Sequence, residues 1–220
     1  SFQFLLPLLE TDFDAMVIEL PGRGKRILEP LVTSRDAALM DLAMAIRSRL
    51  NGQPYMIYGH SMGAFFTPGI VHMLHRSGKP PVGVVVSGTP TPVVAEGMAR
   101  HKMSQEELAA ELKIMGGVPE EYFHSPELIE FFEPIVRADF QLVETPVPAE
   151  QIPVLNVPVH AMMGTEEWFN ERIDEWKNFT TAGCTTELMT GGHFFIHDHA
   201  PELALRLKEC YDRYLVHRNG

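Results

Sequence analysis

Short apolar runs alternate with longer amphipathic segments along most of this chain. Apolar runs of strand length, bounded by glycine, proline or polar residues, are typical of buried β-strands. The runs are "AMVIEL" (15–20), "YMIY" (55–58), "VGVVVSG" (82–88), "VPVHAMMG" (157–164) and "TTELMTGG" (185–192). All but the last are apolar enough to be buried on both faces, as the strands of a parallel sheet covered by helices are.

Helical periodicity fills the intervals between these runs. Over 35–50, apolar residues recur at three- and four-residue spacing, at Ala38, Leu42, Ala45, Ile46 and Leu50. Further helices are predicted over 62–77, 170–180 and 201–217. Strands that alternate with helices predict an α/β fold, with a mostly parallel sheet flanked by helices and joined by right-handed crossovers.

One segment, residues 91–152, breaks the alternation. It has no convincing strand but carries helical patterns over 104–117 and 125–144, the first of which opens with the capping box of Ser104 and Glu107. Such a segment is too long for a plain crossover between strands. We therefore expect a helical lid over 91–152, inserted into one core that comprises 1–90 and 153–220.

The strongest candidate for chemistry is Ser61, in Gly59-His60-Ser61-Met62-Gly63. The pattern G-x-S-x-G places a serine on a strained strand-to-helix turn, where the neighbours two positions away must lack bulk. A predicted strand precedes it and an apolar helical segment follows. The N–H of Met62 would then be a donor to an oxyanion. An ordinary turn serine is the alternative interpretation.

A nucleophilic serine needs a base, and His193 has the position expected for one. It follows the last predicted strand and two glycines, as the histidine of an α/β-hydrolase does. A histidine in a surface loop is the alternative. His197, Asp198 and His199 lie close behind, but no second ligand group with matching spacing appears, so we expect no metal and no cofactor.

The net charge and the cysteine content limit which kinds of partner and which cellular compartment we expect. The formal net charge of −11 argues against nucleic acid or an anionic membrane as a partner. No apolar run approaches the roughly 18 residues of a membrane span. The two cysteines, Cys184 and Cys210, need no disulfide framework and favour a reducing, cytoplasmic compartment. We expect a monomer.

Five stretches together resemble one family. They are "ELPGRGKR" (19–26), "GHSMGA" (59–64), "LKIMGGVPEE" (112–121), "RADF" (137–140) and "GGHFF" (191–195). The chain is similar, over essentially its whole length, to the type II (external) thioesterases of polyketide and nonribosomal-peptide assembly, in the α/β-hydrolase superfamily. The resemblance implies hydrolysis of acyl thioesters on the phosphopantetheine arm of an acyl or peptidyl carrier protein. It matches Ser61 to the nucleophile, His193 to the base and Met62 to an oxyanion donor.

The chain departs from the family at the triad acid. The family has an aspartate in a pattern like G-x-x-D, whereas this chain reads Gly164-Thr165-Glu166-Glu167. The matching position therefore holds Glu167, which can accept the N–H of His193 and stabilise its imidazolium. Glu166 is the alternative acid and Asp174 a third. Glu166 and Glu167 also fit a solvated pair at the start of a helix.

A second departure concerns the start of the chain. Family members open with a strand and a loop resembling F-P-y-A-G-G, which gives the second oxyanion N–H. This chain begins at Ser1 in what reads as the helix after that loop, so we expect the strand and the loop to precede Ser1.

Two further sets of residues are candidates for binding. Arg23 and Arg26 fit contacts with a phosphate or an acidic carrier, or else local salt bridges of a solvated loop. The lid residues Met115, Phe123, Phe132 and Phe140, with Phe131 beside them, fit an acyl channel or the core of the lid itself.

The sequence thus predicts a thioesterase with a Ser-His-acid mechanism. Two alternatives stay open. One is a carboxylesterase or lipase that acts on small free esters. The other is a carrier-binding module whose catalysis is impaired by the glutamate and by an incomplete oxyanion hole.

Overall fold

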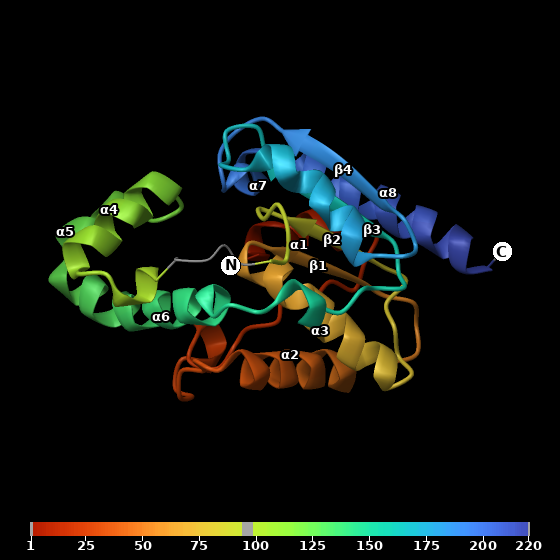
Figure 1. The fold of residues 1–220 in the computed structure, drawn as a ribbon, viewed down its shortest axis with the longest axis horizontal. Coiled ribbons are helices and arrows are strands. Elements are labelled where there is room, and N and C mark those ends of the chain that lie inside the picture. The colour runs from red at the N-terminus through yellow and green to blue at the C-terminus, as the bar shows by residue number, and fades with distance from the viewer. Residues whose placement is uncertain (1, 94–98, 220) are drawn as a thin grey trace.

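A four-stranded parallel sheet forms the centre of the molecule (Figure 1). The structure is a computed structural model that describes residues 2–93 and 99–219. The strands lie in the order β1 (Met56–His60), β2 (Gly83–Ser87), β3 (Val159–Gly164) and β4 (Cys184–Met189). Each corresponds to one of the predicted apolar runs. Because all pairs are parallel, the carboxyl ends of the strands share one edge of the sheet.

Helices cover both faces of the sheet, as predicted. The side chains of successive β2 residues point to opposite faces. Val84 and Val86 pack with residues of α3 (Met62–Arg76) and η5 (Asn170–Phe179), whereas Val85 packs against α8 (Ala200–Asn219). Helix α2 (Arg35–Arg49) packs on the outer side of α3 (Figure 1). The remaining short elements are η1 (Phe2–Phe4), α1 (Leu6–Leu9), η2 (Gly24–Arg26), η4 (Ala149–Gln151) and α7 (Phe195–Asp198).

One local prediction is wrong, and another is right in place but differs in helix type. Residues 15–20 are irregular rather than a strand, because no neighbouring strand among the described residues pairs with them and strand geometry depends on that pairing. The helix predicted over 170–180 is present over 170–179, as the 3₁₀ helix η5, which begins after Phe169 in the left-handed conformation (φ 65°). A 3₁₀ run has poorer hydrogen-bond geometry than an α-helix, and here Trp176, which is fully buried, fastens it to the sheet.

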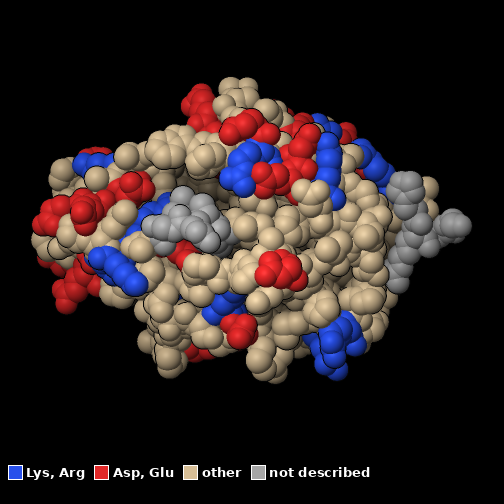
Figure 2. Space-filling view, in the orientation of Figure 1, with Lys and Arg blue, Asp and Glu red and all other residues tan. Residues whose placement is uncertain are grey.

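The inserted helices form a separate layer beside the sheet (Figure 1). They are η3 (Arg100–Lys102), α4 (Gln105–Met115), α5 (Glu120–His124) and α6 (Pro126–Glu144). The predicted capping box opens α4, where Ser104 and Glu107 each accept the other's backbone N–H. Leu108, Leu112 and Tyr122 bury against Phe140, which gives these helices a small core of their own. Figure 2 shows acidic side chains gathered at the end of the molecule that α4 and α5 form.

None of the helices in the described part of the chain is long and apolar enough to cross a membrane.

Candidate active site

Ser61 lies between the end of β1 and the start of α3, at the carboxyl edge of the sheet. Its backbone has φ 53° and ψ −116°, a conformation that costs a non-glycine residue about 1–3 kcal/mol. Its N–H donates to the carbonyl of Ser87 at the end of β2, at 2.8 Å. That bond and the helix hold the strained turn and present the side chain beyond the edge of the sheet.

The two glycines of G-x-S-x-G play different parts. A Cβ atom on Gly59 would lie 2.6 Å from the carbonyl oxygen of Gly63, so the close approach of β1 to α3 requires a glycine at Gly59. A Cβ atom on Gly63 would meet no atom of the described residues within 4 Å. The expectation that both positions must lack bulk is therefore right for Gly59 and wrong for Gly63 in the part of the chain described.

His193 lies in the loop after β4 and reaches across to the serine. Its Nε2 is 2.9 Å from Oγ of Ser61, and its Nδ1 is 2.7 Å from Oε2 of Glu167. An ionised carboxylate only accepts hydrogen bonds, so Nδ1 carries the hydrogen and Nε2 is left to accept the serine hydroxyl. The three side chains thus form a continuous hydrogen-bonded row of hydroxyl, imidazole and carboxylate, the arrangement that a nucleophile, a base and an acid require.

Glu167 is held in this row by its second carboxylate oxygen. Oε1 accepts the backbone N–H of Gly164 at the end of β3, at 2.8 Å, and the side chain is only 6% exposed. This fold-back shows how the longer side chain fits where the resemblance leads one to expect an aspartate. Glu166 is exposed, and Asp174 bonds instead to Thr186. Neither is placed beside His193.

Met62 is the first residue of α3. The first N–H groups of an α-helix have no acceptor within the helix, and the helix dipole makes them favourable partners of a negative charge. The Met62 N–H directly follows Ser61 in the chain, which is the position of one of the two oxyanion donors in an α/β-hydrolase.

A second histidine, His60, lies beside the row and was not singled out from the sequence. Its ring centroid is 4.9 Å from that of His193, and its Nδ1 is 2.9 Å from Oγ of Ser87, which also bonds to the hydroxyl of Tyr58. Burial, and secondarily the nearby His193 and His197, hold the pKa of His60 well below its ordinary value. A neutral imidazole therefore lines this side of the site. The sequence contained one signal for this role, since His60 directly precedes Ser61.

The arginines of the "PGRGKR" stretch make ion pairs within the protein. Arg23 donates to Asp139 of α6 at 2.6 and 3.0 Å, and Arg26 pairs with Glu29 and Asp41. The interpretation as local salt bridges therefore fits Arg26, whereas Arg23 pairs with a distant segment of the chain. The Arg23 contact also joins two of the stretches that carry the family resemblance.

The lid residues predicted to bind an acyl chain occupy different environments. Phe140 is buried in the small core of the inserted helices, against which Met115 and Phe123 also pack. Phe132 is 42% exposed and lies beside Phe131 on the outer part of α6.

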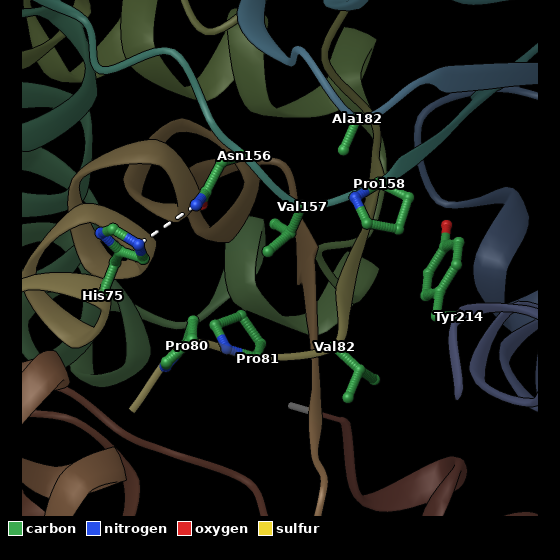
Figure 3. Close-up of a pocket in the computed structure, with 9 residues that line it drawn as sticks. All are labelled: His75, Pro80, Pro81, Val82, Asn156, Val157, Pro158, Ala182 and Tyr214. Atoms are coloured by element: carbon green, nitrogen blue, oxygen red, sulfur yellow. Dashed lines mark hydrogen bonds between the residues drawn. The ribbon is translucent and has the colours of Figure 1, made fainter. Parts of the chain in front are cut away.

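A cavity of about 410 Å³ lies at the opposite edge of the sheet from Ser61 (Figure 3). Its walls come mainly from the segments that lead into β2, β3 and β4, with His75 hydrogen-bonded to Asn156 on one side and Tyr214 on the other (Figure 3). The lining residues are His75, Pro80, Pro81, Val82, Asn156, Val157, Pro158, Ala182 and Tyr214. None of Ser61, His193 or Glu167 reaches this cavity.

A parallel sheet flanked by helices, with a serine on a strained turn beside a histidine and a carboxylate, defines an α/β-hydrolase with the geometry of a serine hydrolase. The family model of the thioesterase domain matches residues 1–210. The chain belongs to this family and is a thioesterase.

The chain is also similar to individual proteins and to solved structures. The chain is 29% identical over 210 residues to linear gramicidin dehydrogenase LgrE of Brevibacillus parabrevis, across 92% of this chain and 79% of that protein. It is 26% identical over 197 residues to the medium-chain S-acyl fatty acid synthase thioesterase of Homo sapiens, across 86% and 73%. The structure of the type II thioesterase BorB from the borrelidin biosynthetic cluster matches with a TM-score of 0.74 at 29% identity, across 87% and 78%. The predicted resemblance to type II thioesterases is confirmed.

Proposed function

We propose that the protein hydrolyses acyl groups from the phosphopantetheine arm of an acyl or peptidyl carrier protein during polyketide, nonribosomal-peptide or fatty-acid assembly. The observation that carries the proposal is the row from Ser61 through His193 to Glu167. The names of relatives from a borrelidin cluster, a gramicidin pathway and a fatty acid synthase support the choice of substrate.

The first half of the reaction is acylation. Oγ of Ser61 attacks the thioester carbonyl while Nε2 of His193 takes the hydroxyl proton. Glu167 stabilises the imidazolium through Nδ1–H, and the Met62 N–H donates to the oxyanion. The C–S bond then breaks, and the proton on Nε2 passes to the leaving sulfur.

The second half is hydrolysis of the acyl-enzyme. A water molecule takes the place of the departed thiol and gives its proton to Nε2 of His193 as it attacks the ester carbonyl. The bond to Oγ of Ser61 breaks, the proton returns to that oxygen, and the carboxylic acid leaves.

The helices of residues 91–152 act in this proposal as a lid over a core of 1–90 and 153–220, with Met115, Phe123, Phe132 and Phe140 as candidates for acyl contact. Their small core supports a unit that moves as one body, and the Arg23–Asp139 ion pair ties α6 of this unit to the core. The free Cys184 and Cys210 support a cytoplasmic location. We take the protein to act as a monomer on its carrier partner.

The test compares two substrates that carry the same acyl group, one on a phosphopantetheinyl carrier protein and one as a p-nitrophenyl ester. We expect a higher kcat/KM on the carrier thioester. Ser61→Ala should abolish hydrolysis of both, while Ser48→Ala, which changes a serine on α2 far from the site, should keep it. A clear preference for the free ester would instead support a carboxylesterase. Failure of a fluorophosphonate to label Ser61 would support a carrier-binding module.

A further inference from the structure

The turn that ends α4 presses directly on the residue that follows His193. Gly116 and Gly117 both have positive φ, 74° and 76°, which glycine tolerates. A Cβ atom on Gly117 would lie 2.2 Å from Cε2 of Phe194, with two more ring atoms at 2.5 and 2.6 Å. A Cβ atom on Gly116 would come no nearer to that ring than 4.0 Å. The lid backbone at Gly117 is therefore in close contact with the Phe194 ring.

Phe194 stands between this turn and the imidazole of His193. Its ring centroid is 5.0 Å from that of His193, with the two planes at 81°. On its other side the ring stacks on His197 at 6.2 Å with an angle of 28°. Phe194 therefore has neighbours in the lid, in α7 and at the proposed base.

The hydrogen bonds of His193 fix two edges of its ring but leave the tilt of the ring to its packing. Ser61 and Glu167 hold Nε2 and Nδ1. His60 and Phe194 pack against the rest of the imidazole. A change in the position of Phe194 would therefore be passed on to the ring that must transfer the proton.

We propose that Phe194 is a positioning residue, which the Gly117 turn of the lid pins against His193 so that the imidazole stays aligned between Ser61 and Glu167. The proposal rests on the proposed function, since alignment matters to the rate only where His193 is the base. It makes the hydrolytic step depend on a docked lid, because withdrawal of the turn frees the Phe194 ring.

The direct test is Gly117→Ala, with Gly116→Ala as its matched control. Both variants place alanine at a positive φ and so strain the backbone, but only Gly117→Ala drives a methyl group into the Phe194 ring. The ring and the turn must separate by about an ångström, and a misplacement of that size near reacting groups costs up to about 10²-fold in rate. We expect Gly117→Ala to lower kcat about 10- to 100-fold with little change in KM, and Gly116→Ala to stay near the wild type.

Variants of Phe194 separate positioning from folding. Phe194→Tyr keeps the ring and should keep kcat, whereas Phe194→Ala should lower it. The double variant Gly117→Ala/Phe194→Ala should be no slower than Phe194→Ala alone, because the ring that the methyl group displaces is gone. The thermal midpoint of each variant, and the rate of labelling by a small fluorophosphonate, which requires His193 but not the acyl chain, complete the comparison. The labelling rate should fall in parallel with kcat.

Three results would overturn the proposal. They are equal kcat for the two alanine variants, multiplicative losses in the double variant, and a change in KM alone. Each can arise while Ser61→Ala still abolishes hydrolysis, so a failure of this inference is distinguishable from a failure of the proposed function.

Discussion

Two histidine–glutamate pairs connect the neighbouring strands β3 and β4. One lies within the strands and the other beyond their carboxyl ends. His160 and Glu187 lie within the strands, with Nε2 of His160 3.3 Å from Oε2 of Glu187. His193 and Glu167 lie in the loops beyond the carboxyl ends of the same strands, 2.7 Å apart. The chemical groups are the same, but the neighbours of the two histidines differ.

The second nitrogen of each histidine decides what the pair can do. Nε2 of His193 faces the hydroxyl of Ser61, whereas Nδ1 of His160 bonds to the hydroxyl of Thr185, 2.7 Å away within the strand. Ser61 lies on a strained turn beyond the carboxyl end of β1 and at the start of α3, whereas Thr185 lies within strand β4. In the proposed mechanism, His193 and Glu167 act as base and acid because their hydrogen bonds end on the hydroxyl of Ser61.

The charged and hydrogen-bonding neighbours of the His160–Glu187 pair also differ from those of the His193–Glu167 pair. Burial lowers the pKa of His160 and outweighs the attraction of Glu187. Burial acts to raise the pKa of Glu187, but the hydrogen bonds and charge of Arg206, with His160, outweigh it and hold that pKa below its ordinary value. Glu187 is thus balanced by an arginine, while Glu167 is held by a backbone N–H and by His193.

The largest effect expected is from His193→Gln set against His160→Gln. Glutamine keeps hydrogen-bonding capacity but cannot take a proton from Ser61. Loss of the base of a triad lowers kcat by about 10⁶-fold where it has been measured, and we expect a fall of that order for His193→Gln on an acyl thioester. His160→Gln should keep kcat, because His160 does not touch the site. Equal losses in the two variants would contradict the distinction between the pairs.

The acids provide the next comparison. Glu167→Gln keeps the shape of the side chain but removes the charge that stabilises the imidazolium, and should lower kcat by about 10⁴-fold. Glu166→Gln and Glu187→Gln should leave kcat near that of the wild type. If Glu166→Gln alone loses rate by orders of magnitude, Glu167 is not the acid.

The two buried histidines with lowered pKa values predict an acid-dependent loss of stability. His60 and His160 are neutral in the folded protein but take up a proton in the unfolded chain below about pH 6.5. The unfolded state then binds more protons, so the stability that they contribute is present above pH 6.5 and is lost as the pH falls from there. Each contributes a slope of at most about 1.4 kcal/mol per pH unit.

Urea unfolding between pH 7 and 5 measures this slope. His160→Gln should make it shallower without altering kcat at pH 7. An unchanged slope would show that burial of His160 does not disfavour its protonated form.

The smallest effect concerns the arginine that balances Glu187. Arg206 is about one-third exposed, so its ion pair with Glu187 is partly screened by solvent. Arg206→Gln should lower the free energy of unfolding by about 1 kcal/mol or less and leave kcat unchanged, while Arg206→Lys should lose less. A marked fall in kcat for Arg206→Gln would mean that the structural pair is coupled to the active site.

The sheet and two side chains of the row, Ser61 and His193, could be predicted from the sequence because each depends on a local pattern. Apolar runs mark β1 to β4, the elbow motif marks Ser61, and the glycine loop after a strand marks His193. The local sequence does not show whether Glu166 or Glu167 faces His193, because the side chains of adjacent residues in a turn point in different directions. That choice depended on the fold-back of Glu167 onto the N–H of Gly164.

Contacts between distant segments were beyond the sequence. Arg23 and Asp139 are 116 residues apart, and Gly117 meets Phe194 through the folding of the lid. No periodicity predicts which distant side chains will meet, although these contacts join stretches that carried the family resemblance. Residues 15–20 failed as a strand for a similar reason, because an apolar run becomes a strand only when another strand pairs with it.

The most direct test of the central claim is to trap the acyl-enzyme. The protein is mixed with an acyl-phosphopantetheinyl carrier protein, quenched in acid within milliseconds and analysed by peptide mass spectrometry. The acyl group should be found on the peptide that carries Ser61 and should be absent from Ser61→Ala. An acyl adduct on another residue, such as Cys184, or turnover that persists in Ser61→Ala, would contradict the assignment of Ser61 as the nucleophile.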